Sequence, residues 1–307
     1  MTASEFAVSS SAALADPAPI RALISEVELR DGAPPLSDQA TTHLQPVPPA
    51  IDTSPTDATP DVQHLLVGDP RTGRLLGYAQ LDGDSLELAA DAGTATATGA
   101  VIEALLDAAE RARPGFHVWA HGQRSPIAPA AARRGYQRHR ELYRLRRPAA
   151  DVAAVPPPDG ITLRAFVPGQ DEIGWLAVNA AAFATHAEQG RWTIDDLRAR
   201  EAEPWFDPAG FLLAEMSGAS ATAEIVGFHW TKIHPDGNGE VYVLGVSPGV
   251  QGMGLGPALL AAGLQVLAGR DVLLYVDGSN ERARNLYRKS GFVDDEVDIQ
   301  FTYHPSR

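Results

Sequence analysis

The sequence predicts an α/β protein built from two tandem copies of one unit. Short alternating or apolar runs, typical of strands, recur between longer segments with helical periodicity. The chain has 307 residues, a length that favours two domains of roughly 150 residues each over one large core. The same series of elements also occurs twice, once on each side of a proline-rich segment near the middle of the chain.

The duplication is visible as matched patterns in the same order. In each half an alternating strand surrounds a glycine, at 74–79 and at 224–229. Farther along, each half has an apolar strand that contains an aromatic residue. A glycine followed by a second aromatic residue comes 16 positions later: Gly135 after Trp119, and Gly291 after Tyr275. An ordered series at equal spacing indicates two copies of one supersecondary arrangement.

Proline-rich segments set the expected boundaries. The segment 148–160 contains Pro156-Pro157-Pro158 and predicts a semi-rigid linker. We therefore expect a first domain at 1–147 and a second at 161–307. Another proline-rich stretch, 46–61, predicts a long surface loop.

The elements of the second copy can be predicted in order. Thr193 followed by Asp195 and Asp196 indicates a helix start, because a hydroxyl caps free N–H groups and acidic residues favour the first turn. We expect helices at about 171–183, 193–202, 254–268 and 280–290, and strands at 211–215, 224–232, 239–246, 271–276 and 296–303.

Composition argues against several classes of partner. The formal charge is −14 and there is no cysteine, so we expect neither nucleic acid nor an anionic membrane as a partner, and no disulfide. The most apolar helical run, 257–269, is too short to span a bilayer, and residues 1–12 lack the basic residues of a secretory signal. We expect a cytoplasmic monomer.

A glycine-rich turn follows the strand at 239–246. It reads Gln251-Gly252-Met253-Gly254-Leu255-Gly256 and leads into an apolar helix. Glycines allow backbone N–H groups to converge, and a helix N-terminus adds partial positive charge, so this turn predicts an anion-binding site. A tight structural connection is the alternative.

Two other nucleotide-binding patterns fit less well. A P-loop ends in Gly-Lys-Ser/Thr, whereas Gly256 precedes Pro257-Ala258. The glycine spacing also differs from the dinucleotide fingerprint, but Asp277 lies 21 residues after Gly256 at the end of a strand. A dinucleotide site therefore stays open as an alternative at this point.

The order Gln-x-x-Gly-x-Gly, then Asn280, Tyr287 and Gly291-Phe292 after the next strand, resembles the Gcn5-related N-acetyltransferase (GNAT) superfamily. This resemblance implies two tandem GNAT domains. Each would have a mixed sheet split between two splayed strands, with acetyl-CoA between the strands and its pyrophosphate on the loop 251–256.

A closer resemblance is to the mycothiol synthases, a family of tandem GNAT enzymes. It is carried by His229-Trp230-Thr231-Lys232, by Gly239–Val246, by Asn179–Phe183 and by Glu188-Gln189-Gly190. The resemblance implies acetylation of the cysteinyl amine of cysteinyl-glucosaminyl-inositol, which gives mycothiol and CoA. It covers the second half closely and the first half in outline.

The family's functional residues map onto this sequence position by position. Backbone groups would hold the acetyl and pantetheine end at Leu244, Gly245 and Val246. The pyrophosphate would bind at Gln251, Gly252, Met253, Gly254, Leu255, Gly256 and Pro257, and the CoA would be flanked by Asn280, Glu281, Arg282, Ala283, Arg284 and Asn285. The acceptor would touch Glu188, Lys232, Glu240 and Tyr275, together with Asp38 of the first domain, where the family has a glutamate.

The first copy departs from the family pattern. Its corresponding turn, 91–99, has neither the glycine spacing nor a basic residue, and Ala131 stands where Tyr287 stands in the second copy. We therefore expect a degenerate acetyl-CoA loop there.

The chemistry of amine acetylation suggests roles for two residues. Glu240 would accept the ammonium proton, directly or through water. Tyr287, two helical turns after Asn280 and on the same helix face, would protonate the departing thiolate. His229 and His234, five residues apart across a strand and turn, are not spaced as a ligand pair, so we expect no metal. An acetyltransferase for another amine and a non-catalytic acyl-CoA-binding module stay open as alternatives.

Overall fold

The computed structural model describes residues 6–44, 62–184, 189–217 and 223–303. The chain forms two compact units, 1–142 with 296–307 and 143–295. This division differs from the predicted boundaries at 147 and 161 because β12 (Val293–Thr302) begins in the second unit and pairs antiparallel with β5 (His117–Ala120) of the first. Residues 299–302 therefore belong to the first unit's sheet.

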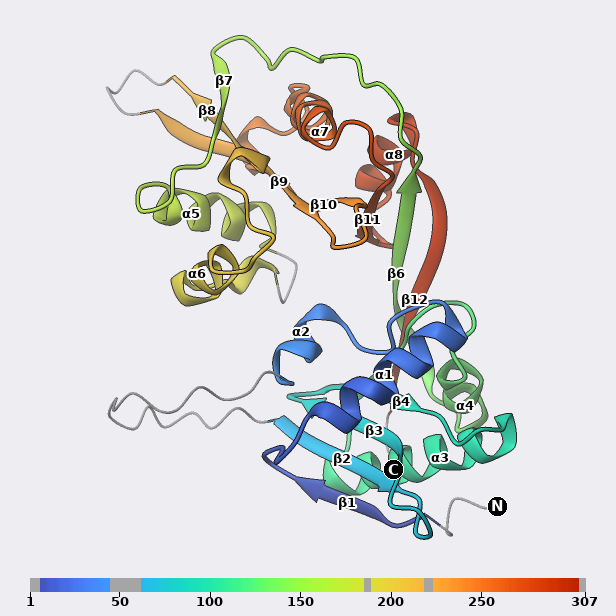
Figure 1. Ribbon diagram of the computed structural model, residues 1–307. Helices are drawn as coiled ribbons and strands as arrows, with labels where there is room; N and C mark the ends of the chain where they lie inside the picture. Colours follow the sequence, from blue (N-terminus) through green and yellow to red (C-terminus); the bar gives the residue numbers. More distant parts are fainter. Residues whose placement is uncertain (1–5, 45–61, 185–188, 218–222, 304–307) are drawn as a thin grey trace, which may run out of the picture. The chain divides into compact units, whose positions relative to one another are not determined.

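The first unit is a mixed sheet with helices on both faces (Figure 1). Its strand order is β1-β2-β3-β4-β5-β12-β6. The remaining strands are β1 (Val8–Ser11), β2 (Val62–Gly68), β3 (Leu75–Asp82), β4 (Ser85–Ala90) and β6 (Gln137–Arg147). One face carries α1 (Ala18–Asp31) and α2 (Asp38–Thr42), and the other carries α3 (Ala95–Ala112) and α4 (Ile127–Arg133).

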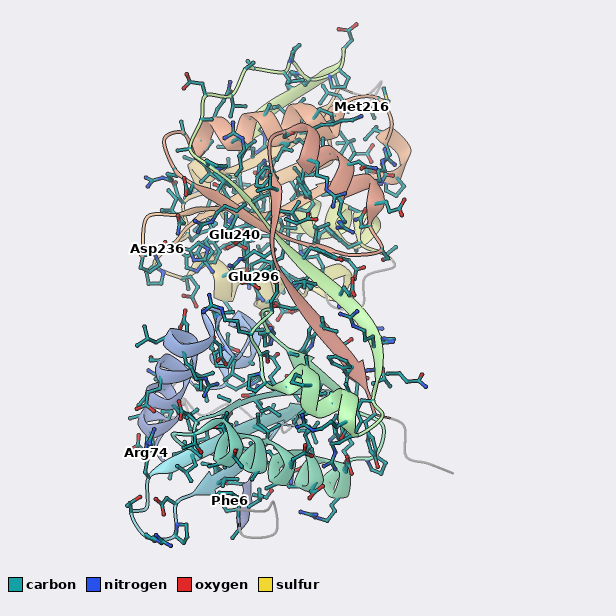
Figure 2. All side chains as sticks on the ribbon, turned by 90° about the vertical axis from the view of Figure 1, so that its right-hand side faces the viewer. Phe6, Arg74, Met216, Asp236, Glu240 and Glu296 are labelled. Atoms are coloured by element: carbon teal, nitrogen blue, oxygen red, sulfur yellow. The ribbon has the colours of Figure 1, made fainter. Side chains whose placement is uncertain are left out.

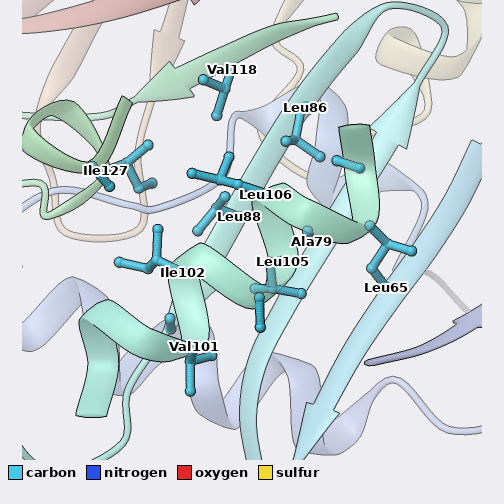
Figure 3. Packing of buried hydrophobic residues seen from close by; sticks show 14 of the residues in the cluster. Leu65, Ala79, Leu86, Leu88, Val101, Ile102, Leu105, Leu106, Val118 and Ile127 are labelled. Atoms are coloured by element: carbon cyan, nitrogen blue, oxygen red, sulfur yellow. The ribbon is translucent and has the colours of Figure 1, made fainter. Parts of the chain in front are cut away.

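Helix α3 forms the core of this unit with the strands beneath it (Figure 3). Its residues Val101, Ile102, Leu105 and Leu106 recur at helical spacing and are buried against strand side chains. Gly77 on β3 allows this close approach, because a Cβ there would overlap the side chain of Val101.

The second unit repeats this plan with the strand order β6-β11-β10-β9-β8-β7. Its strands are β7 (Ile161–Ala165), β8 (Phe211–Met216), β9 (Glu224–Ile233), β10 (Gly239–Val246) and β11 (Val272–Asp277). One face carries α5 (Glu172–Ala182) and α6 (Ile194–Glu201), and the other carries α7 (Leu255–Val266) and α8 (Glu281–Lys289). These elements confirm the predicted helices and strands to within about three residues; β7 was not predicted.

The predicted linker 148–160 has no helix or strand, and it is fixed to the second unit. Asp271 accepts a hydrogen bond from the Ala149 N–H at 3.0 Å, and Gln265 donates to the Val152 carbonyl at 3.3 Å. Among the described residues, no helix is long and apolar enough to cross a membrane.

A buried histidine fixes α7 on the sheet. His229 of β9 is fully buried, and its Nδ1 donates to the Leu259 carbonyl of α7 at 2.7 Å. Burial lowers the pKa of His229 to about 4, so the ring is neutral. Gly263 lies directly over the ring, because a Cβ at this position would overlap the imidazole. Contact between helix and strand therefore depends on a glycine inside the helix.

We expect Gly263→Ala to lower the free energy of unfolding by about 1–3 kcal/mol, because the added methyl group must push α7 away from His229. Chemical denaturation of the full chain measures this change. Gly99→Ala in α3 is the matched control. A Cβ there meets nothing within 4 Å, so alanine should leave stability unchanged or raise it slightly. Equal stability of the two variants would contradict the proposed contact.

Candidate active site

The central feature of the second unit is the early separation of two parallel strands. β10 and β11 share two register pairs, Gly239 with Val272 and Glu240 with Leu273. β10 then continues to Val246, paired along its other edge with β9. The ladder between β10 and β11 ends at their first residues, so beyond it the inner edge of β10 offers backbone N–H and C=O groups to a ligand.

Leu244, Gly245 and Val246 lie on this diverging part of β10, where the family resemblance predicts the acetyl and pantetheine contacts. A Cβ at Gly245 would meet the Phe228 ring at 2.7 Å and the Phe183 ring at 3.2 Å. Aromatic side chains therefore already fill the space above this glycine. The groups left for a ligand at this position are those of the backbone.

The loop after β10 has the conformation expected of an anion site. Gly252 and Gly254 both have left-handed backbones, with φ of 87° and 95°. Helix α7 begins at once at Leu255, and no side chain caps its N-terminus at Gly254. Consecutive N–H groups in such a turn form an anion-binding concavity, which the positive end of the helix dipole strengthens.

Gln251 connects this loop to its neighbours. Its Nε2 donates to the Val246 carbonyl at 3.1 Å, and its Oε1 accepts from Arg282 Nη1 at 2.9 Å. Arg282 is exposed in the first turn of α8, and the Asn280 side chain caps that helix by accepting from the Ala283 N–H at 3.0 Å. The predicted CoA-flanking residues therefore lie at a helix start beside the glycine loop.

Tyr287 projects from α8 into the core beneath β10 and β11. It packs with Val241, Leu274 and Phe292, and its ring meets the Phe292 ring edge-on at 5.8 Å. Burial raises the pKa of Tyr287 to about 12. The phenol is therefore protonated at neutral pH, as an acid for a thiolate leaving group must be.

Glu240 lies at the point where β10 and β11 separate, near the turn that contains Asp236 (Figure 2). Its side chain is buried, and its Oε2 is 2.7 Å from Nε2 of His234. Lys232 of β9 pairs directly with Glu240 in the antiparallel register and is also buried.

The strand register also places Tyr275 on the same face of the sheet as Glu240. Glu240 pairs with Leu273, and Tyr275 follows two residues later on β11, so Glu240 and Tyr275 project from the same face of the sheet. Tyr287 packs on the opposite face, beside Leu274. The structure thus places the predicted acceptor residues Lys232, Glu240 and Tyr275 on one face, and the predicted acid on the other.

Sequence reasoning missed three polar and aromatic residues around Lys232. Its ammonium lies 5.1 Å from the Trp205 ring centroid and 5.5 Å from that of Tyr242. Arg200 of α6 donates from Nε to the Tyr242 hydroxyl at 3.0 Å and stacks over Trp192 at 3.9 Å. Tyr242 could have been found from its position two residues after Glu240; Arg200 and Trp205 carry no comparable signal.

Two predicted acceptor residues are not among the described side chains. Glu188 lies outside the described residues. Asp38 begins α2 in the first unit, but its side chain is outside what the structure describes.

The first unit has the same strand separation but a different loop. β4 and β5 pair in parallel only at Ser85 with His117 and Leu86 with Val118. At the start of α3, however, the chain's own side chains occupy the donors. The Ala92 N–H donates to Thr98 at 3.0 Å, the Gly93 N–H to Asp91 at 2.8 Å and the Ala97 N–H to Thr94 at 3.2 Å.

The described part of the chain contains no group of three His, Asp or Glu residues able to hold a metal ion.

Residues 177–292 match the sequence pattern of the acetyltransferase (GNAT) family. The chain is also similar to proteins named mycothiol acetyltransferase. It is 44% identical to that of Thermomonospora curvata, covering 93% of each chain, and 45% identical to that of Frankia alni, covering 94% of this chain and 91% of the relative.

Solved structures show the fold. A GCN5-related N-acetyltransferase from Sphaerobacter thermophilus superposes with a TM-score of 0.65 at 22% identity, covering 98% of this chain and 97% of the other. A tandem GNAT protein from the clavulanic acid biosynthesis pathway superposes with a TM-score of 0.64 at 17% identity, covering 98% and 100%. Together with the sequence matches, these findings identify a tandem GNAT fold and an acyltransferase. The chain belongs to the mycothiol acetyltransferase family.

Proposed function

We propose that the second unit transfers the acetyl group of acetyl-CoA to the cysteinyl amine of cysteinyl-glucosaminyl-inositol, giving mycothiol and CoA. The observation that carries this proposal is the early separation of β10 and β11. It leaves a backbone edge free beside an uncapped, glycine-rich helix start. The family relationship supports the choice of acceptor.

The residues at this site suit acetyl-CoA as the co-substrate. The free edge of β10 at Leu244 to Val246 can bond an extended amide chain such as pantetheine in the manner of an added strand. The N–H groups from Gly252 to Gly256 suit a pyrophosphate, because they converge at the positive end of α7. The N–H of Val246 is suited to bind the carbonyl oxygen as negative charge develops on it.

Glu240 is the base in this mechanism. Leu244 lies four positions along β10 from Glu240, about 13 Å at about 3.3 Å per residue, so the ammonium proton would reach the carboxylate through water. Once the ammonium loses a proton, the amine attacks the thioester carbonyl, a C–N bond forms, and the C–S bond breaks. Lys232 and Tyr275, on the same face as Glu240, are positioned to bind polar groups of the acceptor.

Tyr287 is the acid. Its phenol donates a proton to the sulfur as CoA leaves and regains one from solvent. Because its pKa is raised to about 12, the protonated form persists until the pH rises through that value. Activity should therefore show no alkaline loss from this group below about pH 10.

We further propose one productive site per chain. In the first unit, Thr94, Thr98 and Asp91 already accept the N–H groups that would face a phosphate, and Asp91 adds negative charge. The buried residue Ala131 stands where Tyr287 stands in the second unit, so the first unit lacks the proposed acid. The monomeric state and a cytoplasmic location stay predictions.

The test of function is CoA release from acetyl-CoA in the presence of the cysteinyl acceptor, with the acetylated product identified by mass. We expect Glu240→Gln to lower kcat by on the order of 10²–10⁴, with a nearly unchanged KM for acetyl-CoA. Tyr287→Phe should also lower kcat, because it removes the acid but retains the ring that packs on Phe292.

A panel of amino sugars, drugs and peptide N-termini serves as the control for acceptor identity. If one of these amines is acetylated faster than the cysteinyl compound, that amine is the acceptor and the proposed acceptor is wrong. Wild-type kcat in both variants would show that neither residue acts in the chemistry.

Calorimetric titration tests the cofactor loop and the number of sites. We expect one acetyl-CoA per chain and about tenfold weaker binding in Gly254→Ala, because alanine is strained at a φ of 95° and the loop must change shape. Gly249→Ala is the matched control, since its added Cβ meets nothing within 4 Å. Two equivalent sites, or equal affinity in both variants, would contradict the assignment.

A further inference from the structure

A histidine next to the proposed base has no role in the mechanism so far. His234 lies in the turn between β9 and β10, and its Nε2 is 2.7 Å from Glu240 Oε2. Its other ring nitrogen, Nδ1, makes no hydrogen bond within the described residues and is not among the buried unpartnered atoms. The imidazole therefore contacts the base at one end and reaches solvent at the other.

The turn fixes the backbone of His234. The His234 N–H donates to the Asn238 carbonyl, and the His234 carbonyl accepts from the Gly237 N–H, both at 2.9 Å. Arg270 donates to the Gly237 carbonyl at 3.1 Å, and Asp236 accepts from the Asn238 N–H at 2.9 Å. Because the backbone is already ordered, only the side-chain torsions of His234 have to be fixed when the ring contacts Glu240.

Glu240 must release the proton that it takes from the acceptor. Its side chain is only 9% exposed, whereas that of His234 is 26% exposed. A carboxyl group buried in this way must lose its proton after each turnover before it can act as a base again. His234 is the hydrogen-bond partner that connects it to the surface.

We propose that His234 conducts the proton from Glu240 to water after each deprotonation of the acceptor, a role that rests on the proposed function. In the resting pair, Nε2–H donates to the Glu240 carboxylate. Once Glu240 has taken the ammonium proton, exchange with water moves the ring proton from Nε2 to Nδ1, and the new O–H of Glu240 donates its proton to Nε2. The imidazolium then releases its Nδ1 proton to water. One proton enters from the amine and one leaves to solvent, and the ring ends with Nε2–H donating to the carboxylate, as at the start.

The surrounding charges are consistent with a transient imidazolium. Asp236 lies in the same turn as His234, and the backbone N–H of Asn238 lowers the pKa of the Asp236 carboxyl, so it is ionised at neutral pH. Lys232, Tyr242 and Arg270 are further ionisable groups near the pair among the residues that the structure describes. His234 acts through Glu240, so it is a positioning and proton-conducting residue and does not touch the substrate.

Two substitutions separate proton conduction from simple orientation. His234→Gln retains an N–H donor for Glu240 but cannot carry a proton, whereas His234→Ala removes both functions. We expect both to lower kcat about 10- to 100-fold with KM for acetyl-CoA within twofold of wild type. Imidazole added to the buffer should restore a concentration-dependent part of the His234→Ala activity, since it can accept the proton in place of the missing ring.

The control is His139→Gln, the same change at an exposed histidine of the first unit, which should leave kcat unaltered. Wild-type kcat and pH profile in His234→Gln would overturn proton conduction. Failure of imidazole to raise the rate of His234→Ala would also overturn it, and this measurement does not depend on the glutamine variant. A wild-type enzyme that does not acetylate the cysteinyl amine would overturn the proposed function and this role together.

Discussion

The proposed site of the second unit depends on where two parallel strands, β10 and β11, stop pairing. β10 and β11 are joined at only two register pairs, at Gly239 and Glu240. A sheet that continued this ladder would satisfy its own backbone groups and bury them. Because the ladder ends, the remaining N–H and C=O groups of β10 need another partner, and the glycine loop that follows is open to an anion at the same end of the strand.

If only the second unit is active, as we propose, this separation alone is not sufficient for a working site. Both have the early end of parallel pairing, at Ser85 and Leu86 in one and at Gly239 and Glu240 in the other. They differ in what occupies the following helix start. Threonine and aspartate side chains accept those N–H groups in the first unit, whereas two left-handed glycines leave them without a side-chain cap in the second. We therefore propose that a few capping residues, on an intact sheet, are enough to remove the phosphate site from the first unit.

Much of the second unit could be predicted from the sequence, because periodicity and turn residues specify strands and helices locally. The loop from Gln251 to Gly256 and the strand from Gly239 to Val246 are examples, since their glycine spacing and apolar pattern are local signals. The pairing of β12 with β5 could not be predicted, because a strand pattern does not specify which sheet it joins. Nor could the contact of Arg200 with Tyr242, which links residues from separate elements. The five-residue spacing of His229 and His234 indicates only that the two are not a metal-ligand pair. The contact of His234 with Glu240 arises from the turn between β9 and β10.

A crystal structure of the full chain with acetyl-CoA would show whether the cofactor binds where β10 and β11 separate. We expect the pantetheine along β10, the thioester carbonyl at the Val246 N–H, the pyrophosphate at the start of α7, and no nucleotide at the start of α3. Acetyl-CoA bound at α3, or bound in the second unit away from the diverging edges of β10 and β11, would contradict this expectation.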